Sequence, residues 1–477
     1  MQKLIGLDVG TTSVKGVSVS PQGELLNRAE EAYPWSTPHP GWAEQDPEAW
    51  WGASQTVLAR LGAAEAGAIG LSGQMHGLVV LDEDLGPLRP AILWNDQRTA
   101  QECLEIEQRV GSARLIELTG NRALTGFTAP KLLWLRNNEQ DLYARIAHVL
   151  LPKDYVRLRL TQERATDVSD ASGTLLFDVA HRCWSEDLLS ALEIEQQWLP
   201  AVFESNEVTG RAPGDIAVAA GAGDQAAGAL GVGVDRPGLL SLVLGTSGVM
   251  FAVLPGFETD EQARLHIFCH AVPGTWHAMG VSLSAAGSLR WLRDALGTNA
   301  GYEALLGEAE GWAPGVEGLT FLPYLAGERT PHSDPNARAA FCGLSVRHDR
   351  GALVRAVLEG VAFALRDSLE LLRAIGVEAD RARISGGGAR SRLWLRIISS
   401  VLGIPIEVTN VQEGAAFGAA LLGGVAGGVF GDVTDAVEAC VVRKETIEPV
   451  DSWRGAYDDG YETFQALYPA LKSVRNR

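Results

Sequence analysis

The sequence contains little cysteine, and no two of its cysteines lie close together. The 477 residues include five cysteines, each more than 70 residues from the next along the chain. There is no CxxC pair, so the spacing excludes a zinc ribbon and gives no support to a disulfide framework. Few and scattered cysteines are typical of a reducing compartment, and we therefore expect a cytoplasmic protein.

Positive charge is also in short supply. Lys and Arg number 40 against 59 Asp and Glu, which gives a net charge of −19. Nucleic acid and anionic membranes both require a basic face, so we expect neither as a partner. A small phosphorylated ligand is not excluded, because it needs only a local site.

No segment has the pattern of a secretory leader or a membrane span. The chain starts with the strand-like "KLIGLDVG", residues 3–10, without a basic and apolar leader. The longest uncharged run covers residues 414–431 and consists mostly of Gly and Ala. Such a run has too few large apolar residues to span a bilayer, and it predicts a close-packed interior helix.

Several catalytic motifs are absent as well. The chain has no G-x-x-x-x-G-K-[ST] P-loop and no G-x-S-x-G nucleophile elbow. Residues 221–228, "GAGDQAAG", match a G-x-G-x-x-A dinucleotide fingerprint, but Asp224 would repel a pyrophosphate there. The acid expected about 20 residues later is also missing. A nicotinamide-dependent dehydrogenase is therefore the weaker alternative, and Asp224 suits a general base better.

Three histidines raise the question of a metal site. His266, His270 and His277 lie in a segment broken by Pro and Gly, which predicts a hairpin. On a helix the first two would share a face as metal ligands, but no acidic partner accompanies them. We expect strand histidines with structural hydrogen bonds.

Strand and helix patterns alternate along the chain, and its length predicts two domains. The turn-forming "VDRPG" marks the boundary and gives domains 1–236 and 237–477. The segments "GLDVGTTSVKGVSVS", 6–20, and "LLSLVLGTSGVMFAVL", 239–254, both predict two strands around a Gly-Thr-Ser turn. Two such hairpins, half a chain apart, indicate duplicated α/β lobes with a ligand between them.

The turns of both hairpins could hold an anion, because small and hydroxyl residues let backbone N–H groups approach a phosphate closely. A third loop, within 382–403, places three glycines at the expected start of a helix, whose N-terminus favours an anion or a nucleotide. Ordinary turns remain the alternative at each place. Together with the separated acids Asp8 and Asp224, these loops suit ATP-dependent phosphoryl transfer, in which one acid assists a metal and the other accepts a hydroxyl proton.

These residues make the chain resemble the FGGY family of carbohydrate kinases over essentially its full length. Matching motifs include "GLDVGTTSVKG", "SGQMHG", "ILWNDQRT", "LLPKDYVRLRLT", "LAGERTPHSDP" and "ISGGGARSRLW". The family's first signature is met by Gly126, Thr128, Lys131, Trp134, Asn137 and Asn138. The resemblance implies two ribonuclease-H-like α/β domains of the actin and hexokinase ATPase fold around a central ATP cleft, with ATP and Mg²⁺ as cofactors.

The resemblance also assigns roles to single residues. Asp224 matches the catalytic base and contacts the sugar, and Asp8 is the catalytic and metal-binding acid that faces Mg–ATP across the cleft. Met75 and His76 match the sugar-binding pair. ATP contacts are expected at Thr11, Thr12, Gly245, Thr246, Ser247, Gly387, Gly388 and Ser391.

The sugar-binding pair bears on the substrate. Glycerol kinases carry "NQRET" where this chain has "GQMHG", so a clamp of Arg and Glu becomes Met75 and His76. This pair leaves room for a longer ketose, which makes D-xylulose, phosphorylated to D-xylulose 5-phosphate, the first expectation. Ribulose, L-xylulose, another pentulose or a polyol remain alternatives, as does a non-catalytic actin-like ATP-binding protein. A homodimer is an open expectation for the assembly.

One position departs from the family pattern. In the second signature, "FCGLSVRHDRGALVRAVLEG", Ala352 stands where a polar residue is usual. We expect a helix to start there with weakened capping and with the chemistry unaffected.

Overall fold

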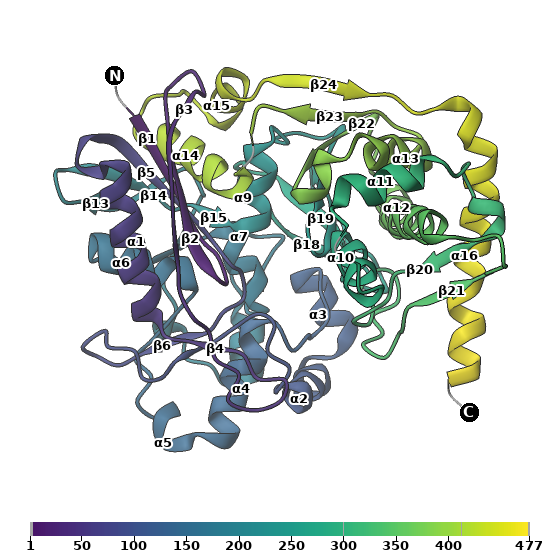
Figure 1. Cartoon of the computed structure of the whole chain (residues 1–477). Coiled ribbons are helices and arrows are strands. Elements are labelled where there is room, and N and C mark those ends of the chain that lie inside the picture. Colours follow the sequence, from purple (N-terminus) through teal and green to yellow (C-terminus); the bar gives the residue numbers. More distant parts are fainter. Residues whose placement is uncertain (1–2, 299, 412, 476–477) are drawn as a thin grey trace.

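The computed structural model describes residues 3–298, 300–411 and 413–475. Two seven-stranded sheets organise these residues, the first to the left and the second to the right in Figure 1. The first sheet contains, in spatial order, β13 (Val208–Ala212), β14 (Ile216–Ala219), β5 (Ala66–Gly73), β1 (Lys3–Val9), β2 (Ser13–Val19) and β3 (Leu25–Ala32), with β15 (Ala222–Gly223) beside β5. The second contains β18 (His266–Cys269), β19 (Trp276–Ser282), β17 (Gly248–Leu254), β16 (Leu239–Leu244), β22 (Arg381–Ser385), β23 (Ile406–Thr409) and β24 (Arg443–Ile447).

Both sheets repeat one pairing pattern. The strand β1 pairs antiparallel with β2 and parallel with β5, which pairs parallel with β14. In the second sheet, β16 pairs antiparallel with β17 and parallel with β22, which pairs parallel with β23. The two predicted hairpins are thus β1–β2 and β16–β17. This repetition confirms the duplicated α/β lobes, and it is the ribonuclease-H-like arrangement that the resemblance implies.

Helices cover the first sheet on both faces. On one face, α1 (Pro47–Leu61) packs on β2 and β3, and α6 (Pro152–Thr161) packs on α1 and β5. On the other face lie α14 (Gly414–Ala426) and α9 (Asp224–Gly231). Alternation along β1 explains the two layers, because Leu7 joins the apolar core with α1 while Gly6 faces the backbone of α14.

The second sheet packs on the long buried helix α12 (Arg350–Ala374), which also contacts α13 (Arg392–Leu402). The last helix, α16 (Arg454–Arg475), runs along the right edge of Figure 1.

The remaining α-helices of the described residues are α2 (Ala100–Val110), α3 (Ser112–Thr119), α4 (Thr128–Asn138), α5 (Gln140–Tyr143), α7 (Val168–Ala171), α8 (Glu186–Leu192), α10 (Ala286–Ala295), α11 (Tyr302–Glu310) and α15 (Val433–Cys440). Short strands complete the described chain: β4 (Glu44–Gln45), β6 (Val79–Leu81), β7 (Ala91–Ile92), β8 (His148–Leu150), β9 (Ala165–Asp167), β10 (Phe177–Asp178), β11 (Cys183–Trp184), β12 (Ala201–Phe203), β20 (Thr320–Leu322) and β21 (Ala340–Cys342).

The start of α12 corrects the expectation about its cap. The helix begins at Arg350, two residues earlier than predicted, and its N-cap is Asp349. The Asp349 carboxylate accepts a hydrogen bond from the backbone N–H of Ala352 at 3.0 Å. The expected weakening of the cap is therefore wrong, because Ala352 supplies only a backbone donor and needs no polar side chain.

The uncharged run at 414–431 forms α14 as far as Ala426, and most of this helix is buried, as predicted for an interior helix. It comes from the second half of the chain but packs against β1, β5 and α9 of the first (Figure 1). Glycines permit this close approach. A Cβ atom on Gly418 would lie 1.9 Å from the carbonyl oxygen of Ala227, and one on Gly231 would lie 1.9 Å from that of Gly414.

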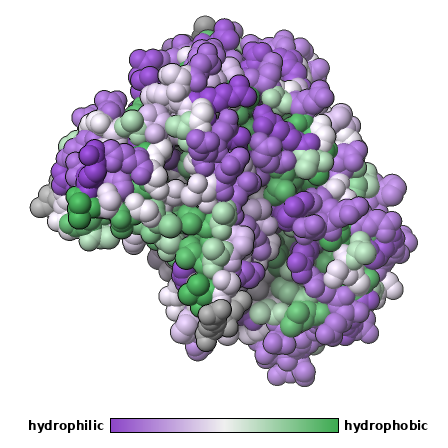
Figure 2. Space-filling view, turned by 90° about the vertical axis from the view of Figure 1, so that its right-hand side faces the viewer, coloured by the Kyte–Doolittle hydropathy of each residue, from purple (hydrophilic) through white to green (hydrophobic). Residues whose placement is uncertain are grey.

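The molecular surface is mainly hydrophilic on the face that Figure 2 shows. Hydrophobic residues occur there in smaller patches among the hydrophilic ones. Within the described ranges, no helix combines the length and apolar character that crossing a bilayer would require.

The contact between α14 and α9 yields a stability prediction. Gly418→Ala should lower the free energy of unfolding by about 1–3 kcal/mol, because the new methyl group collides with backbone that cannot move aside easily. The matched control is Gly52→Ala on α1, where a Cβ meets nothing within 4 Å. This control should leave stability unchanged or raise it by about 0.5–1 kcal/mol. Urea midpoints compare the two variants, and a wild-type midpoint for Gly418→Ala would contradict the close packing.

Candidate active site

The register of the first sheet brings the two predicted acids to one edge. Asp8 on β1 pairs with Ser72 on β5, and Ser72 pairs in turn with Ala222 on β15. Both pairings are parallel, so the chain leaves β5 and β15 at the same edge at which Asp8 lies. Asp224 directly follows β15, and residues 75–76 follow β5. The sheet thus gathers residues from three separate parts of the sequence.

Buried polar groups hold Asp224 in place. It is the first residue of α9, and the N–H of the preceding Gly223 donates to Ser169 Oγ at 3.1 Å. Ser169 Oγ donates to the Asp167 carboxylate at 2.5 Å, and Lys153 Nζ lies 2.8 Å from that carboxylate. All of these partners are buried. The backbone before Asp224 is therefore anchored to a charged group that water does not reach.

His76 has an uncommon backbone conformation, with a φ angle of 69°. Its carbonyl oxygen accepts hydrogen bonds from Lys131 Nζ at 2.8 Å and from Thr128 Oγ1 at 3.1 Å. Its Nδ1 lies 2.6 Å from the carbonyl oxygen of Gly173, which only accepts, so Nδ1 carries the proton and Nε2 keeps a lone pair. Burial lowers the pKa of His76 to about 3, and the ring stays neutral.

One cavity of about 270 Å³ contains Asp224 together with Met75 and His76. Both lobes contribute to its walls. The other lining residues are Trp94, Leu124, Gly126, Phe127, Gln225, Ser247, Val249, Met279, Val281 and Arg329. The structure therefore brings the predicted base and the predicted sugar-binding pair to one cavity.

The two acids differ from ordinary carboxyl groups. Burial and, to a smaller extent, the nearby Asp8 raise the pKa of Asp224 to about 7, against hydrogen bonds from Gln225 that lower it. Burial also raises the pKa of Asp8 to about 6, against the opposing charge of Lys15. Both groups can therefore change protonation state close to neutral pH, which is typical of acids and bases in enzyme sites.

The first hairpin turn contacts the wall of this cavity. Ser72 Oγ donates to the Asp8 carboxylate at 3.3 Å, and Trp94 Nε1 donates to Thr11 Oγ1 at 3.0 Å. Thr11 thus contacts Trp94 in the wall of the first cavity, and Asp8 lies near Asp224 in the same cavity. The exposed Thr12 follows Thr11 in the turn.

A second cavity, of about 580 Å³, lies at the edge of the second sheet. Val243 on β16 pairs in parallel with Ser385 on β22, so the turns that follow these strands emerge side by side. Among the predicted nucleotide residues, the cavity is lined by Gly245, Thr246, Gly387, Gly388 and Ser391. Ser247, the next residue of the same turn, lines the first cavity. The second hairpin therefore joins the two cavities.

The glycine triplet differs from its prediction in one respect. Residues Gly387–Arg390 form a short 3₁₀ turn, and the helix α13 begins only at Arg392. Ser391 is its N-cap, accepting from the N–H of Trp394 at 3.2 Å. The helix N-terminus thus lies beyond the glycines, because the hydroxyl of Ser391 starts the helix better than glycine does.

The described residues include no group of three or more His, Cys, Asp or Glu side chains arranged to hold a metal ion. Of the three histidines that were predicted to form structural hydrogen bonds, two do so in the described part of the chain. His266 Nδ1 lies 2.9 Å from Asn121 Oδ1, and His270 Nε2 lies 3.3 Å from the carbonyl oxygen of Val234. Burial holds the pKa of His277 well below its usual range.

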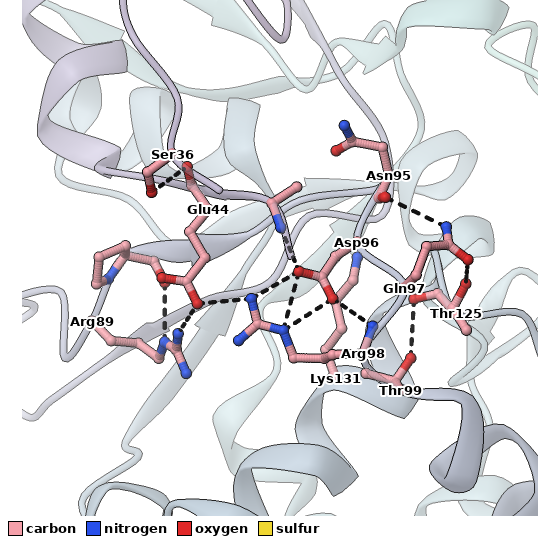
Figure 3. A network of polar contacts seen from close by, with 12 residues as sticks. Ser36, Glu44, Arg89, Asn95, Asp96, Gln97, Arg98, Thr99, Thr125 and Lys131 are labelled. Atoms are coloured by element: carbon pink, nitrogen blue, oxygen red, sulfur yellow. Dashed lines mark hydrogen bonds and ion pairs between the residues drawn. The ribbon is translucent and has the colours of Figure 1, made fainter. Parts of the chain in front are cut away.

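The first family signature lies next to the first cavity, because its Lys131 and Thr128 donate to the backbone of His76. Figure 3 shows Lys131 beside a network in which Arg98 binds both Asp96, at 2.7 Å, and Glu44, at 2.8 Å. The Arg98 guanidinium also lies 3.5 Å from the ring centroid of Trp42. The same guanidinium lies 4.8 Å from the ring centroid of Trp134 on α4, and α4 supplies the hydrogen bonds to His76.

Sequence reasoning did not assign several residues that line the cavity. Trp94 and Arg329 lie within motifs that match the family, but nothing in their local sequence indicates which way they face. Gln225 follows the predicted base directly and could have been found from that position. Phe127 lies next to the signature residues and shares an edge-to-face contact with His76, at 4.8 Å between ring centroids.

Comparison with known proteins agrees with this geometry. The N-terminal domain of the FGGY family of carbohydrate kinases matches residues 3–231, and its C-terminal domain matches residues 240–427. The xylulose kinase of Escherichia coli strain K12 is 42% identical, over 98% of this chain and 99% of that protein. The xylulose kinase of Lactococcus lactis is 39% identical, over 100% of this chain and 98% of that protein.

Solved structures show the same likeness. The crystal structure of a "xyloylose kinase" from Brucella ovis has a TM-score of 0.93 and 42% identity, covering 99% of this chain and 100% of that one. The xylulose kinase from Rhodospirillum rubrum has a TM-score of 0.93 and 32% identity, covering 100% of both chains. Because both domain models match and these relatives align from end to end, the chain belongs to the FGGY family of carbohydrate kinases and is a carbohydrate kinase with the two-domain fold of that family.

Proposed function

We propose that this kinase transfers the γ-phosphoryl group of ATP to the terminal hydroxyl of D-xylulose, which forms D-xylulose 5-phosphate. One observation carries the proposal: Asp224 shares a single cavity with Met75 and His76. Such a cavity offers a base at one place and a neutral imidazole acceptor at another, which suits a small polyhydroxylated substrate. The names of the relatives that align over the whole chain point to the same sugar.

Asp224 is the proposed general base. It accepts the proton of the sugar hydroxyl as that oxygen attacks the γ-phosphorus in line. A base with a pKa near 7 is half ionised at neutral pH, where general-base catalysis is most efficient. Positioning contributes most of the remainder, because the transition state of phosphoryl transfer is loose and little covalent chemistry falls to the protein.

The nucleotide is proposed to lie in the second cavity. Gly245, Thr246, Gly387, Gly388 and Ser391 line it and would contact ATP there. Ser247 lines the first cavity, in which the sugar is proposed to bind and which the γ-phosphate must reach for transfer. Thr11 and Thr12, from the first hairpin, are proposed to contact the phosphates from the other lobe.

Asp8 is the proposed ligand of Mg²⁺ or of its water shell. The site fits the ion, since Mg²⁺ is held in kinases by one or two carboxylates plus substrate phosphates and needs no larger protein cage. The raised pKa of Asp8 reports a carboxylate that has little compensating charge around it. Mg²⁺ would neutralise phosphate charge there.

The choice among pentuloses rests on the sugar-binding pair and on the names of relatives, so a substrate panel tests it directly. D-xylulose, ribulose, L-xylulose and polyols are compared in a coupled ADP assay, with ATP alone as the blank. A strong preference for another sugar would replace the proposed substrate, and no sugar-dependent ADP at all would favour an ATP-binding protein without kinase activity.

We further propose that the domains divide between residues 236 and 237. A homodimer and a cytoplasmic location stay predictions.

Replacing the base should remove most of the activity. Asp224→Asn keeps the shape of the side chain but cannot accept the proton, so kcat should fall by about 10²–10⁴ while ATP binding is retained. The matched control is Asp215→Asn, whose exposed carboxylate forms an ion pair with the exposed Arg211 near the turn between β13 and β14. Steady-state kinetics measure both variants, and a kcat for Asp224→Asn within about threefold of wild type would contradict the assignment.

The raised pKa of Asp224 predicts a pH dependence. Protonated Asp224 cannot accept a proton, so kcat/KM should fall by about tenfold per pH unit below about 7 and level off above it. The measurement is kcat/KM across pH, because that parameter reports the free enzyme, with circular dichroism to verify that the protein stays folded. An unchanged kcat/KM down to about pH 5 would show that the base titrates like an ordinary aspartate.

Asp8→Asn tests the metal site. Asparagine keeps an acceptor oxygen but lacks the charge that holds Mg²⁺, so the variant should need more Mg²⁺ for half-maximal activity and turn over slowly at saturation. Sugar binding without nucleotide, followed by tryptophan fluorescence, should stay as in wild type. Normal Mg²⁺ dependence would remove Asp8 from the metal site, and lost sugar binding would place it on the sugar side.

A further inference from the structure

Arg329 enters the first cavity from the second lobe, on the loop that follows β20. Both of its neighbours are fastened to β19. The Glu328 carboxylate accepts hydrogen bonds from Ser282 Oγ at 2.8 Å and from the N–H of Leu283 at 2.9 Å. Thr330 exchanges two hydrogen bonds with the backbone of Val281, each at 3.0 Å. Glu328 and Thr330 are almost completely buried, at 1% and 0% exposure.

This attachment fixes the direction of the side chain. Because the residues on either side of Arg329 are held against β19, the side chain between them lines the cavity beside Val281 and Met279. It is only partly buried, whereas its two neighbours are enclosed. The loop therefore presents one cation to the space where the sugar is proposed to bind.

The guanidinium of Arg329 has no partner among the residues that the structure describes. It forms no ion pair, no side-chain hydrogen bond and no contact with an aromatic ring within those ranges. The adjacent Glu328 does not pair with it, because that carboxylate is occupied by Ser282, Leu283 and the backbone N–H of Arg329 itself, the last at 2.8 Å. Partial burial of this cation without a partner lowers the pKa of Arg329, and a ligand that accepts its hydrogen bonds relieves the cost of that burial.

Arg329 lies on the His76 side of the cavity, because β19, to which its neighbours are bonded, pairs through Met279 with His266, and the Phe127 ring contacts both His266 and His76. Its charge lowers the pKa of His76 and that of His266. The pKa of Asp224 responds instead to Asp8 and Gln225. A sugar that places its reacting hydroxyl at Asp224 would therefore direct its other end toward Arg329.

We propose that Arg329 binds the carbonyl end of the substrate and selects a ketose over the corresponding polyol, an inference that rests on the proposed function. Arginine offers only donors, and a ketone oxygen only accepts, so the two are complementary. Reduction of the ketone to an alcohol adds a proton that itself needs an acceptor. Among the described side chains at this end, His76 Nε2 is the strong acceptor, and one lone pair cannot serve an additional hydroxyl as well.

The experiment compares D-xylulose with xylitol, its reduced counterpart, in wild type and in Arg329→Met. Tryptophan fluorescence without nucleotide gives the two dissociation constants, since Trp94 lines the cavity. Hydrogen bonds to a charged group predict that Kd for D-xylulose rises about 10- to 100-fold in the variant, with a smaller rise for xylitol. The ratio of the two constants should fall by about tenfold, and KM for the ketose should change more than kcat.

Two further variants keep the result interpretable. Arg329→Lys retains the charge with a less suitable donor geometry and should lie between wild type and Arg329→Met. Arg338→Met is the matched control from the same loop, because Arg338 is exposed and donates only to loop carbonyls. It should leave both dissociation constants unchanged. An equal loss of affinity for ketose and polyol in Arg329→Met, or no loss, would overturn the proposal.

The outcome separates this inference from the proposed function. If wild type phosphorylates another ketose in place of D-xylulose, the proposed substrate fails, and the same comparison with that ketose and its polyol still decides the role of Arg329. If wild type binds polyols more tightly than ketoses, the proposal for Arg329 is overturned whichever sugar is phosphorylated.

Discussion

Two partly buried carboxylates have to lie close together at one edge of one sheet, and much of the first lobe depends on this constraint. Asp8 and Asp224 flank β5 through the parallel register of β1 and β15. Their burial raises both pKa values, to about 6 and about 7. Buried groups such as Lys153 anchor the backbone that precedes Asp224 through Asp167 and Ser169. An acid that would ordinarily titrate near pH 4 thereby becomes suited to proton transfer at neutral pH.

The same site requires the two lobes to meet at a fixed distance. The helix α14 belongs to the second half of the chain, yet its glycines allow it to pack directly on the first sheet and on α9. Because Asp224 begins α9, the contact that joins the lobes also positions the proposed base. Ser247 and Arg329, from the second lobe, line the cavity that also contains Asp224. Substrate contacts on both sides of one cavity are what a kinase needs if closure is to exclude water from the reacting phosphate.

Several predictions from the sequence are confirmed because they depend on local chemistry. The interior helix α14 forms in the uncharged run, as its content of Gly and Ala predicts. The hairpins likewise follow from their own residues. Predictions at helix starts were less accurate. The cap of α12 is supplied by Asp349 and that of α13 by Ser391, since a neighbouring side chain that can accept a hydrogen bond determines where a helix begins.

The sequence by itself determined which chemical groups are available and how they are spaced: a base after one strand, a Met-His pair after another, and glycine turns suited to phosphate. It also determined the duplicated α/β lobes, because hydrophobic periodicity and turn residues act over short distances. Only the tertiary structure decided the rest. Register placed Asp8 beside Asp224, burial shifted their pKa values, and hydrogen bonds from Lys131 and Thr128 hold His76 in its left-handed conformation. Arg329 could not be located from sequence, because a side chain without a partner is recognised only when everything around it has been placed.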